Sequence, residues 1–291
     1  MRRNIPEEIG HVLIVVALFL ASIATLYPFW HVLMYSISDG KEAMNGGIFL
    51  VPRGFSLAQY SVLIRSSNMF TSFRNSVLLV LIGVPFNLVM TASLAFPLAN
   101  KKLIGRGVIS IFVFLTMLFS GGLIPSFLVN RMLGLYDNPL VLILPSAISA
   151  YNMFVMRSFF VGLPVEMEES ALLDGAGPTR VLFSIVLPLS KPVLAALAMF
   201  YGVGHWNNFF TSLIYIESPK YQVFQNFLRS MLLQNSYSQL TGIADFSDLS
   251  SLNSESVKMA AIVLSVIPVL LVYPFLQKYY VKGLTMGSVK G

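Results

Sequence analysis

Residues Glu169–Pro188 read ESALLDGAGPTRVLFSIVLP, and the rest of the chain is organised around them. The stretch is polar and interrupted, and it lies between two apolar segments that are long enough to cross a membrane. Glu166 and Glu169 place negative charge near the N-terminal end of a helix, where the helix dipole stabilises it. Gly175 tolerates the left-handed conformation that ends a helix, and a proline follows three residues later. The pattern predicts a short acidic helix followed by a bend.

The second half of the stretch predicts another short helix, over Arg180–Leu187. Thr179 precedes it and can cap it, and Pro188 opens the next apolar segment. The small residues Ser170 and Ala171 would let the first helix lie close in a groove of another protein. The alternative is an interfacial linker that lies flat on lipid, and shape alone does not separate the two.

Composition excludes a soluble domain. The 291 residues are 56% hydrophobic and 11% charged, against roughly 25% charged residues in a soluble domain. The absence of cysteine excludes disulfides, thiolate metal sites and thiol nucleophiles. The net charge of +6 is spread over the ends of apolar segments rather than gathered into one stripe, which is typical of a membrane protein and argues against nucleic-acid binding.

Six apolar segments approach the ~20 residues that a bilayer core demands. The first, residues 12–37, is longer than a signal peptide and ends in aromatic residues, so we expect a retained first helix. The others are Asn75–Ala99, Val108–Val129, Pro139–Phe160, Pro188–Ile214 and Val257–Tyr280. We therefore expect an all-α integral membrane protein with six transmembrane helices, forming one transmembrane domain over residues 1–291 with core helices in 75–280.

The distribution of lysine and arginine predicts the orientation. Three basic residues lie between the second and third segments, and three follow the sixth: Lys101, Lys102, Arg106, Lys278, Lys282 and Lys290. Both termini and the loop 164–187 are then cytoplasmic, and the long loops 38–74 and 215–256 face outward. In the second outer loop, Tyr221–Gln234 predicts a helix with one apolar face, which would lie on the membrane surface or against a partner.

The loop carries a recognisable spacing. Glu169-Ser170-Ala171, three residues, Gly175, nine residues and Ile185-x-Leu187-Pro188 closely resemble the signature loop of permease subunits in binding-protein-dependent ABC importers. That family usually has Ala where this chain has Ser170. Asp174-Gly175-Ala176 is similar to the carbohydrate-uptake branch, which includes the maltose permeases. The resemblance implies a type I importer permease in which this loop is the coupling helix that docks into a cytoplasmic ATPase. The coupling residues would be Glu168, Glu169, Ser170, Ala171, Asp174, Gly175, Ala176, Ile185, Leu187 and Pro188.

Two further patterns narrow the resemblance. Ser120-Gly121-Gly122-Leu123-Ile124-Pro125 and His205-Trp206-Asn207 resemble permeases for complex or uronate-containing oligosaccharides such as alginate and aldouronate. Sugars are bound by aromatic faces and by amide or hydroxyl groups in a concave site. The candidate substrate path is Tyr151, Asn152, Tyr201, His205, Trp206, Asn207 and Asn208. Alternatively, these groups hydrogen-bond between helices inside the bundle.

The charge of the substrate stays open at this point. A path for an acidic sugar calls for Arg or Lys, and the helix interiors show none. Arg157 and Arg74 lie near helix ends, where each would serve the substrate or act as an interfacial anchor.

Missing motifs bear on the class of protein. The chain has no G-x-x-x-x-G-K-[ST], H-E-x-x-H or G-x-S-x-G motif, and no Asp or Glu in the central turns of its apolar segments. We therefore expect no enzymatic activity, no metal and no cofactor in this chain, and a proton- or sodium-coupled carrier or a channel is the weaker alternative. A non-transport membrane scaffold is the third class. The resemblance implies a bacterial inner-membrane location and an oligosaccharide substrate. The implied partners are a second, homologous permease, an ATPase dimer that binds ATP and Mg²⁺, and an extracytoplasmic solute-binding protein.

Overall fold

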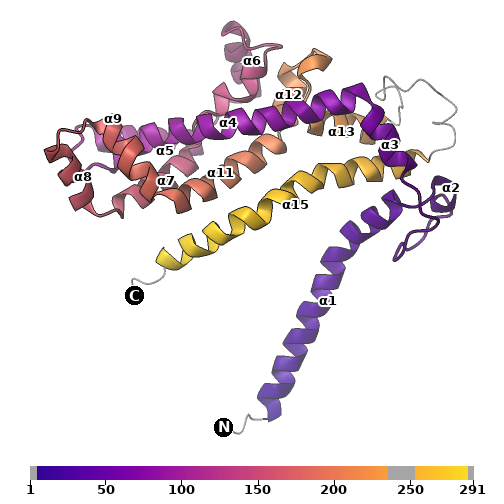
Figure 1. Cartoon of the computed structure of the whole chain (residues 1–291). Helices are drawn as coiled ribbons and strands as arrows, with labels where there is room; N and C mark the ends of the chain where they lie inside the picture. Colours follow the sequence, from indigo (N-terminus) through magenta and orange to yellow (C-terminus); the bar gives the residue numbers. More distant parts are fainter. Residues whose placement is uncertain (1–4, 235–252, 288–291) are drawn as a thin grey trace. The chain divides into compact units, whose positions relative to one another are not determined.

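The computed structural model describes residues 5–234 and 253–287. All regular elements in these ranges are helical, apart from one isolated antiparallel bridge between Ser38 and Phe55. The expected all-α class is therefore confirmed for the described residues. Contacts divide the chain into two compact units, which we describe separately: Met1–Phe70 with Leu228–Ile267, and Thr71–Phe227 with Pro268–Gly291. Figure 1 labels the helices and colours them in chain order.

The elements follow one another along the chain as a series of helices. Their bounds are α1 Ile5–Ser36, α2 Gly40–Ala43, α3 Ala58–Arg65, α4 Ser67–Ala99, α5 Arg106–Leu118, α6 Leu123–Met132, η1 Pro139–Leu142, η2 Leu144–Ser146, α7 Ala150–Val161, α8 Val165–Leu173, α9 Pro178–Val181, the π-helix η3 Leu182–Val186, α10 Leu187–Leu189, α11 Lys191–Trp206, α12 Phe210–Tyr215, η4 Pro219–Tyr221, α13 Phe224–Gln234 and α15 Ser254–Gly287.

Three helices of the described chain are long and apolar enough to cross a membrane, and up to six spans result if each bent pair counts as one. The continuous helices are α1, α4 and α15. The first unit contains α1, whose apolar stretch Gly10–Ser36 agrees with the expected first span. α4 begins at Ser67, eight residues before the expected start at Asn75.

Three of the expected spans are each made of two helical pieces that meet at a bend. The segment expected over 108–129 is broken at Ser120-Gly121-Gly122, and α5 and α6 meet at 116°. The segment expected over 139–160 opens with the 3-10 turns η1 and η2, which lie at 50° to α7. The helix expected over 188–214 ends at Trp206 and resumes as α12, while α11 bends by 87° from the preceding Pro178–Leu189. Gly and Pro at these breaks end the regular hydrogen-bond ladder.

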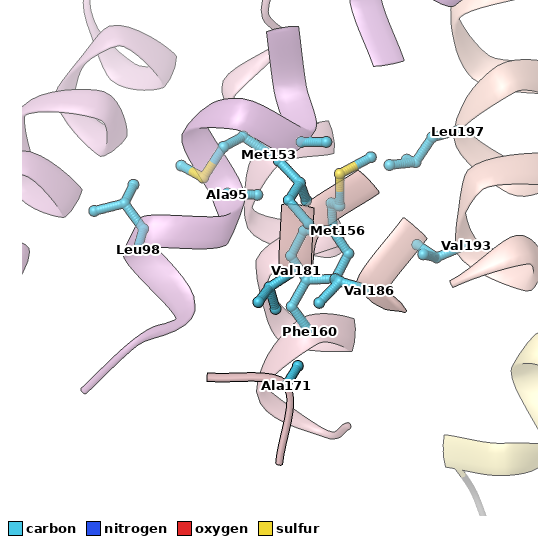
Figure 2. Packing of buried hydrophobic residues seen from close by; sticks show 12 residues of the cluster. Ala95, Leu98, Met153, Met156, Phe160, Ala171, Val181, Val186, Val193 and Leu197 are labelled. Carbon is cyan, nitrogen blue, oxygen red and sulfur yellow. The ribbon is translucent and has the colours of Figure 1, made fainter. Parts of the chain in front are cut away.

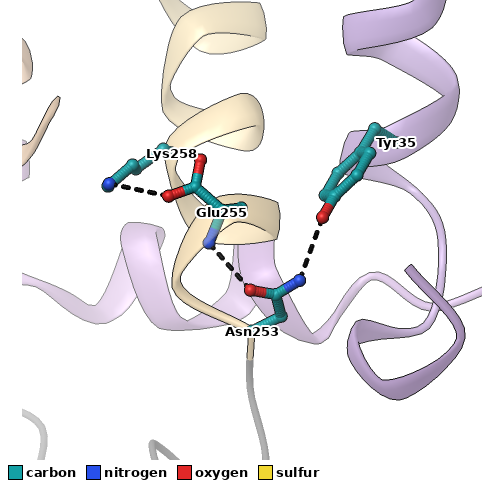
Figure 3. A network of polar contacts seen from close by, with 4 residues as sticks. All are labelled: Tyr35, Asn253, Glu255 and Lys258. Carbon is teal, nitrogen blue, oxygen red and sulfur yellow. Dashed lines mark hydrogen bonds and ion pairs between the residues drawn. The ribbon is translucent and has the colours of Figure 1, made fainter. Parts of the chain in front are cut away.

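In the first unit, a polar network fixes the start of α15 (Figure 3). The Asn253 amide nitrogen donates to the Tyr35 hydroxyl at 3.0 Å, and its oxygen accepts the Glu255 backbone N–H at 3.0 Å. The Glu255 carboxylate pairs with the Lys258 ammonium at 2.8 Å. Lys258 is only 8% exposed, although it lies at the start of the span and not in its interior. Its position at the start of the span, three residues from a carboxylate, explains how the buried charge is tolerated.

In the second unit, the connections that contain Asp137 and Ser218 are held by side-chain bonds to the backbone. The Asp137 carboxylate accepts the backbone N–H groups of Ser218 at 2.8 Å and Glu217 at 3.1 Å, and the Ser218 hydroxyl also donates to it. The Ser218 hydroxyl, followed by the Ser218 and Glu217 backbone donors, holds the pKa of Asp137 below its ordinary value. The Asn75 amide donates to the carbonyls of Lys220 and Gln222, so this loop is tied to α4 as well.

The predicted amphipathic helix exists as α13, but the part of its apolar face that lies in the second unit packs within the chain. Phe224 lies 5.6 Å from the ring of Phe73 and 6.1 Å from that of Trp206, and Phe227 stacks on Phe224. Both phenylalanines are fully buried. Neither a membrane surface nor a partner is therefore needed to cover these two residues.

Candidate functional site

The signature loop begins with α8, and the C-terminal end of α8 has the geometry that the sequence predicts. Gly175 takes the left-handed conformation with φ of 79°. The Ala176 N–H reaches back to the Ala171 carbonyl at 3.0 Å, and the Asp174 N–H to the Ser170 carbonyl at 3.1 Å. The six-to-one bond around a left-handed glycine is a Schellman cap, which satisfies carbonyls that the end of the helix leaves open.

The inner face of α8 is held by a cluster of buried side chains (Figure 2). Ala171 is 8% exposed and packs in the cluster formed by α4, α7, η3 and α11, which includes Leu98, Met156 and Phe160. The proposal that Ala171 makes a close fit with another protein is therefore corrected, because its methyl group faces the chain's own core. A larger residue here would push α8 away from α7.

The outer face of α8 is open. The exposed residues include Glu169, Ser170 and Asp174 among those singled out from the sequence, and the side chain of Glu168 lies outside the described residues. Sequence reasoning missed Leu173, which is 89% exposed. Residues two positions apart on a helix point in different directions, so Leu173 and Ala171 cannot both face the core. The sequence by itself does not show which of the two is exposed.

The second half of the loop differs from the expected helix capped by Thr179. α9 starts at Pro178 with Gly177 at the cap position, and Thr179 lies inside it. The helix then passes into the π-helix η3 before α10. Val181, Leu182 and Val186 are buried in the cluster, while the signature residues Ile185 and Leu187 pack against it and Pro188 is exposed. The buried residues of this half of the loop therefore anchor it to the cluster.

Two arginines join the ends of three segments near the loop. The guanidinium Nε atoms of Arg106 and Arg157 each donate to the Leu98 carbonyl at 2.9 Å. Arg157 also lies 6.0 Å from the ring of Phe154. Of the two roles left open for Arg157, the structure supports the anchor, because this residue fixes the end of α4 to α7.

A polar cluster crosses the interior of the second unit. The Asn87 amide nitrogen donates to the carbonyls of Ser146 and Ala147 at 2.7 and 2.9 Å, which are freed where η2 ends before α7. The Asn87 oxygen lies 2.6 Å from Nε2 of His205. Both Asn87 and His205 are buried, so each bond replaces water that is absent inside the bundle.

These bonds determine which ring nitrogen of His205 carries a hydrogen. Because both amide hydrogens of Asn87 are directed to carbonyls, its oxygen must accept, and His205 Nε2 must carry the hydrogen. Nδ1 of a neutral ring is then an acceptor. The fit is tight, since a Cβ at Gly83 would lie 2.6 Å from Nε2. Gly83 thus allows α4 and α11 to approach at this point.

Tyr201 forms a second link, one turn away from His205. Its hydroxyl lies 2.7 Å from the Thr91 hydroxyl and accepts the Ser149 backbone N–H at 3.0 Å. Beside the two links lies a cavity of about 330 Å³. Its polar lining comes from Ser146, Ser149, Asn152, Tyr201, His205 and Asn208. Such a set offers hydroxyl, amide and imidazole groups without a formal charge, which suits hydroxyl-rich ligands.

Four of the seven residues expected along the substrate path line this cavity: Asn152, Tyr201, His205 and Asn208. The other three are placed elsewhere. Trp206 is 6% exposed and packs against Phe73 and Phe224, Tyr151 is exposed, and Asn207 lies 3.5 Å from the amide of Gln225. Asn87, Thr91 and Gly83 were missed, since no local pattern marks a residue whose partner lies far along the chain. Among the described residues, no group of three His, Asp or Glu side chains is arranged to hold a metal ion.

Comparisons with known proteins match nearly the whole chain. A family model described as "Binding-protein-dependent transport system inner membrane component" matches residues 86–286. The chain is 38% identical to the polygalacturonan/rhamnogalacturonan transport system permease protein YtcP of Bacillus subtilis (strain 168), over 94% of this chain and 96% of that protein. It is 26% identical to the arabinooligosaccharides transport system permease protein AraQ of Halalkalibacterium halodurans, over 100% of both chains.

Solved structures also match. A chain in the crystal structure of a bacterial ABC transporter involved in the import of the acidic polysaccharide alginate matches with a TM-score of 0.88 and 28% identity, covering 96% of this chain and 99% of that chain. A chain of a bacterial alginate ABC transporter in complex with an alginate pentasaccharide-bound periplasmic protein matches with a TM-score of 0.60 at 15% identity, and it shows the fold alone.

Proposed function

The chain belongs to the family of binding-protein-dependent transport system inner membrane components, and from this premise we propose that it carries an acidic oligosaccharide across the bacterial inner membrane. The resemblance drawn from the signature loop is thereby confirmed. As the permease component of an ABC transporter, the chain is distinct from the ATPase subunit, which binds ATP. The system depends on a binding protein, as the family description states.

The substrate class is supported by the named relatives. The permease at 38% identity belongs to a polygalacturonan/rhamnogalacturonan system, and the structure at 28% identity belongs to an importer of the acidic polysaccharide alginate. Polygalacturonan and alginate are both chains of uronic acids. The uncharged polar cavity suits their hydroxyl groups, which outnumber the carboxylates.

The observation that carries the transport mechanism is the division of the signature loop into an anchored half and an open half. Ala171, Val181 and Val186 tie the loop to α4, α7 and α11, while Leu173 and Asp174 face outward. An ATPase that grips the open face and closes on ATP would move α8, and the anchored face would pass this movement to the bundle. The loop and both termini are then cytoplasmic, and a second, different permease completes the path.

We expect Leu173→Asp to break the contact with the ATPase without unfolding the permease. Leu173 is 89% exposed, so a charge there costs the chain's own core little, whereas it would be buried in a docked complex. Co-purification of the ATPase and sugar-stimulated ATP hydrolysis should both fall at least tenfold. Met132→Asp is the matched control, since Met132 is 87% exposed but lies in α6, outside the loop. Equal loss in both variants would contradict the coupling role of α8.

The role of the cavity in sugar binding can be tested with variants that each keep one of the two ring-nitrogen positions of His205. His205→Gln can place a donor where Nε2 stands and so keep the bond to Asn87, but it removes the Nδ1 acceptor. His205→Asn does the opposite. If Nδ1 accepts a sugar hydroxyl, the Gln variant should assemble normally and show a raised KM, while the Asn variant should lose thermal stability. Unchanged transport in a stably assembled Gln variant would leave His205 with a packing role only.

Transport by the full complex also separates the function from its alternatives. Proteoliposomes that contain this permease, its partner permease, the ATPase and the binding protein should accumulate uronate oligosaccharides only when ATP is supplied. Uptake by this chain alone would indicate a secondary carrier or a channel. A complex that assembles but moves no sugar would indicate a scaffold.

A further inference from the structure

A cavity of about 370 Å³ lies beside the coupling helix and has no assigned role. It is bounded by the end of α4, the end of α7, the start of α8 and the segment η3–α10. Phe96, Phe160 and Val186 form part of a mainly apolar wall, whereas Lys101, Lys102 and Glu169 supply its charged edge. The cavity is therefore amphipathic, with cations at one side of an apolar hollow.

The two lysines have no acidic partner among the described residues. Among the described residues, the ion pair joins Lys258 to Glu255, and the exposed side chains of Lys101 and Lys102 form no hydrogen bond or ion pair with another described residue. Both follow directly on the end of α4 at Ala99, where a span reaches the membrane surface. A cation at this depth meets the phosphate layer of the lipid.

We propose that this cavity binds one anionic phospholipid, with its phosphate at Lys101 and Lys102 and the upper part of its acyl chains against Phe96 and Phe160. Two cations face one carboxylate there, so the cavity carries a net positive charge that an anionic headgroup neutralises. A free phosphate would satisfy the lysines but leave the apolar wall uncovered. An acidic peptide would need a backbone to enter among these apolar groups, which is costly without hydrogen-bond partners.

The position of the site gives it a consequence for transport. Met167 and Glu169 of α8 line the same cavity as the lysines. A lipid seated there would contact both the end of α4 and the coupling helix, so its headgroup would fill space that otherwise lets α8 tilt. The lipid should therefore strengthen the coupling of ATP hydrolysis to sugar, in addition to binding.

The test uses the full importer complex, purified in mild detergent and studied by native mass spectrometry with phosphatidylglycerol or phosphatidylethanolamine added. The wild type should retain phosphatidylglycerol in preference. Lys101→Gln/Lys102→Gln should reduce that preference by roughly thirtyfold, as expected for two lysines near an anionic surface. The control Lys191→Gln/Lys220→Gln removes the same charge from two other exposed positions and should retain the lipid.

A second variant separates a seated lipid from general attraction to the bilayer. Ala99→Phe fills the cavity while keeping both lysines, and it should lower phosphatidylglycerol retention as well. Retention equal to wild type in Ala99→Phe would overturn the proposal, as would equal retention of the two lipids. Full displacement by inorganic phosphate would identify a phosphate site instead. If the lysine variant lost the ATPase while lipid retention stayed unchanged, the lysines would serve the protein contact, and the lipid proposal would fail.

Discussion

The coupling loop and the central polar cluster both join elements of the second unit, but they do so in opposite ways. In the loop, apolar side chains such as Ala171 and Val181 face inward and polar residues face outward. In the cluster, Asn87 and His205 are buried and bonded to groups on other spans. The loop presents an open face, which we propose to dock the ATPase, whereas the cluster is satisfied within the chain.

The two regions differ in the property that a substitution would change. A side chain on the open face of α8 changes association when it is replaced, because its environment is supplied by the partner. A side chain in the cluster changes the fold itself, because its replacement leaves buried backbone carbonyls without donors. We therefore expect substitutions in the two regions to separate cleanly into effects on coupling and effects on stability.

The largest effect is expected for Asn87→Leu, which removes three hydrogen bonds at once. The carbonyls of Ser146 and Ala147 and the Nε2 hydrogen of His205 would all lose their partner. We expect a loss of about 2–4 kcal/mol in stability, since intramembrane hydrogen bonds are individually modest but unpaired buried groups are costly. The measurement is thermal unfolding of the purified complex in detergent.

The matched comparison for that variant is Ser93→Leu, at an exposed polar position on the same helix. A drop of similar size in both would mean that leucine in α4 is itself harmful, and the separation between the two regions would be lost. Asn87→Asp sharpens the result further. It retains an acceptor for His205 but no donor for the carbonyls, so an intermediate stability is expected.

An intermediate effect is expected at Gly175, which lies in the loop but is held by backbone geometry. Its φ of 79° disfavours a side chain, so Gly175→Ala should cost about 1–2 kcal/mol locally. The readout is sugar-stimulated ATP hydrolysis, which should fall while the unfolding temperature of the complex changes little. Gly175→Asn should recover part of the activity because asparagine tolerates this conformation. No difference between Ala and Asn would argue against the cap as the cause.

The smallest effect is expected at Asp137, a partly exposed carboxylate outside both regions. Its pKa is below the ordinary 3.8 in the folded protein, because the Ser218 hydroxyl and backbone donors favour the charged form. The folded state therefore binds the proton less readily than the unfolded state, and the stabilisation is present above about pH 4 and lost as the pH falls further. Asp137→Asn should make the unfolding temperature less dependent on pH below that point. A variant with an unchanged pH profile would contradict the role of the charge.

The sequence predicted elements that depend on local patterns. The spacing around Gly175 predicted the left-handed cap, and apolar runs predicted where the chain crosses the membrane, because both follow from residues close in sequence. The size of the bends was not predicted. Ser120-Gly121-Gly122 and Asn207 lie within runs that average as apolar, and a window over some twenty residues does not register one interrupted turn.

The polar cluster could be predicted only in part. His205 and Tyr201 were singled out by type, but their partners Asn87 and Thr91 lie 118 and 110 residues away. The residues next to Asn87 in the sequence do not show that it bonds to other helices, because an asparagine that faces a lipid headgroup could have the same neighbours. Trp206 illustrates the reverse case, since its type suggested a sugar platform and its burial between Phe73 and Phe224 depends on α13.

The π-helix Leu182–Val186 has a consequence for the length of the loop. A helical turn of this kind contains an extra residue compared with the α-helix, so the chain between Gly175 and Ile185 holds one more residue than regular geometry would use. Deleting Ser184 would remove the extra residue and make the turn regular, so Val186 and Leu187 would keep their buried face. A deletion in a regular helical stretch of the loop would instead rotate every later residue by about 100°. A deletion within Leu182–Val186 should therefore be tolerated better than a deletion elsewhere in the nine-residue interval between Gly175 and Ile185.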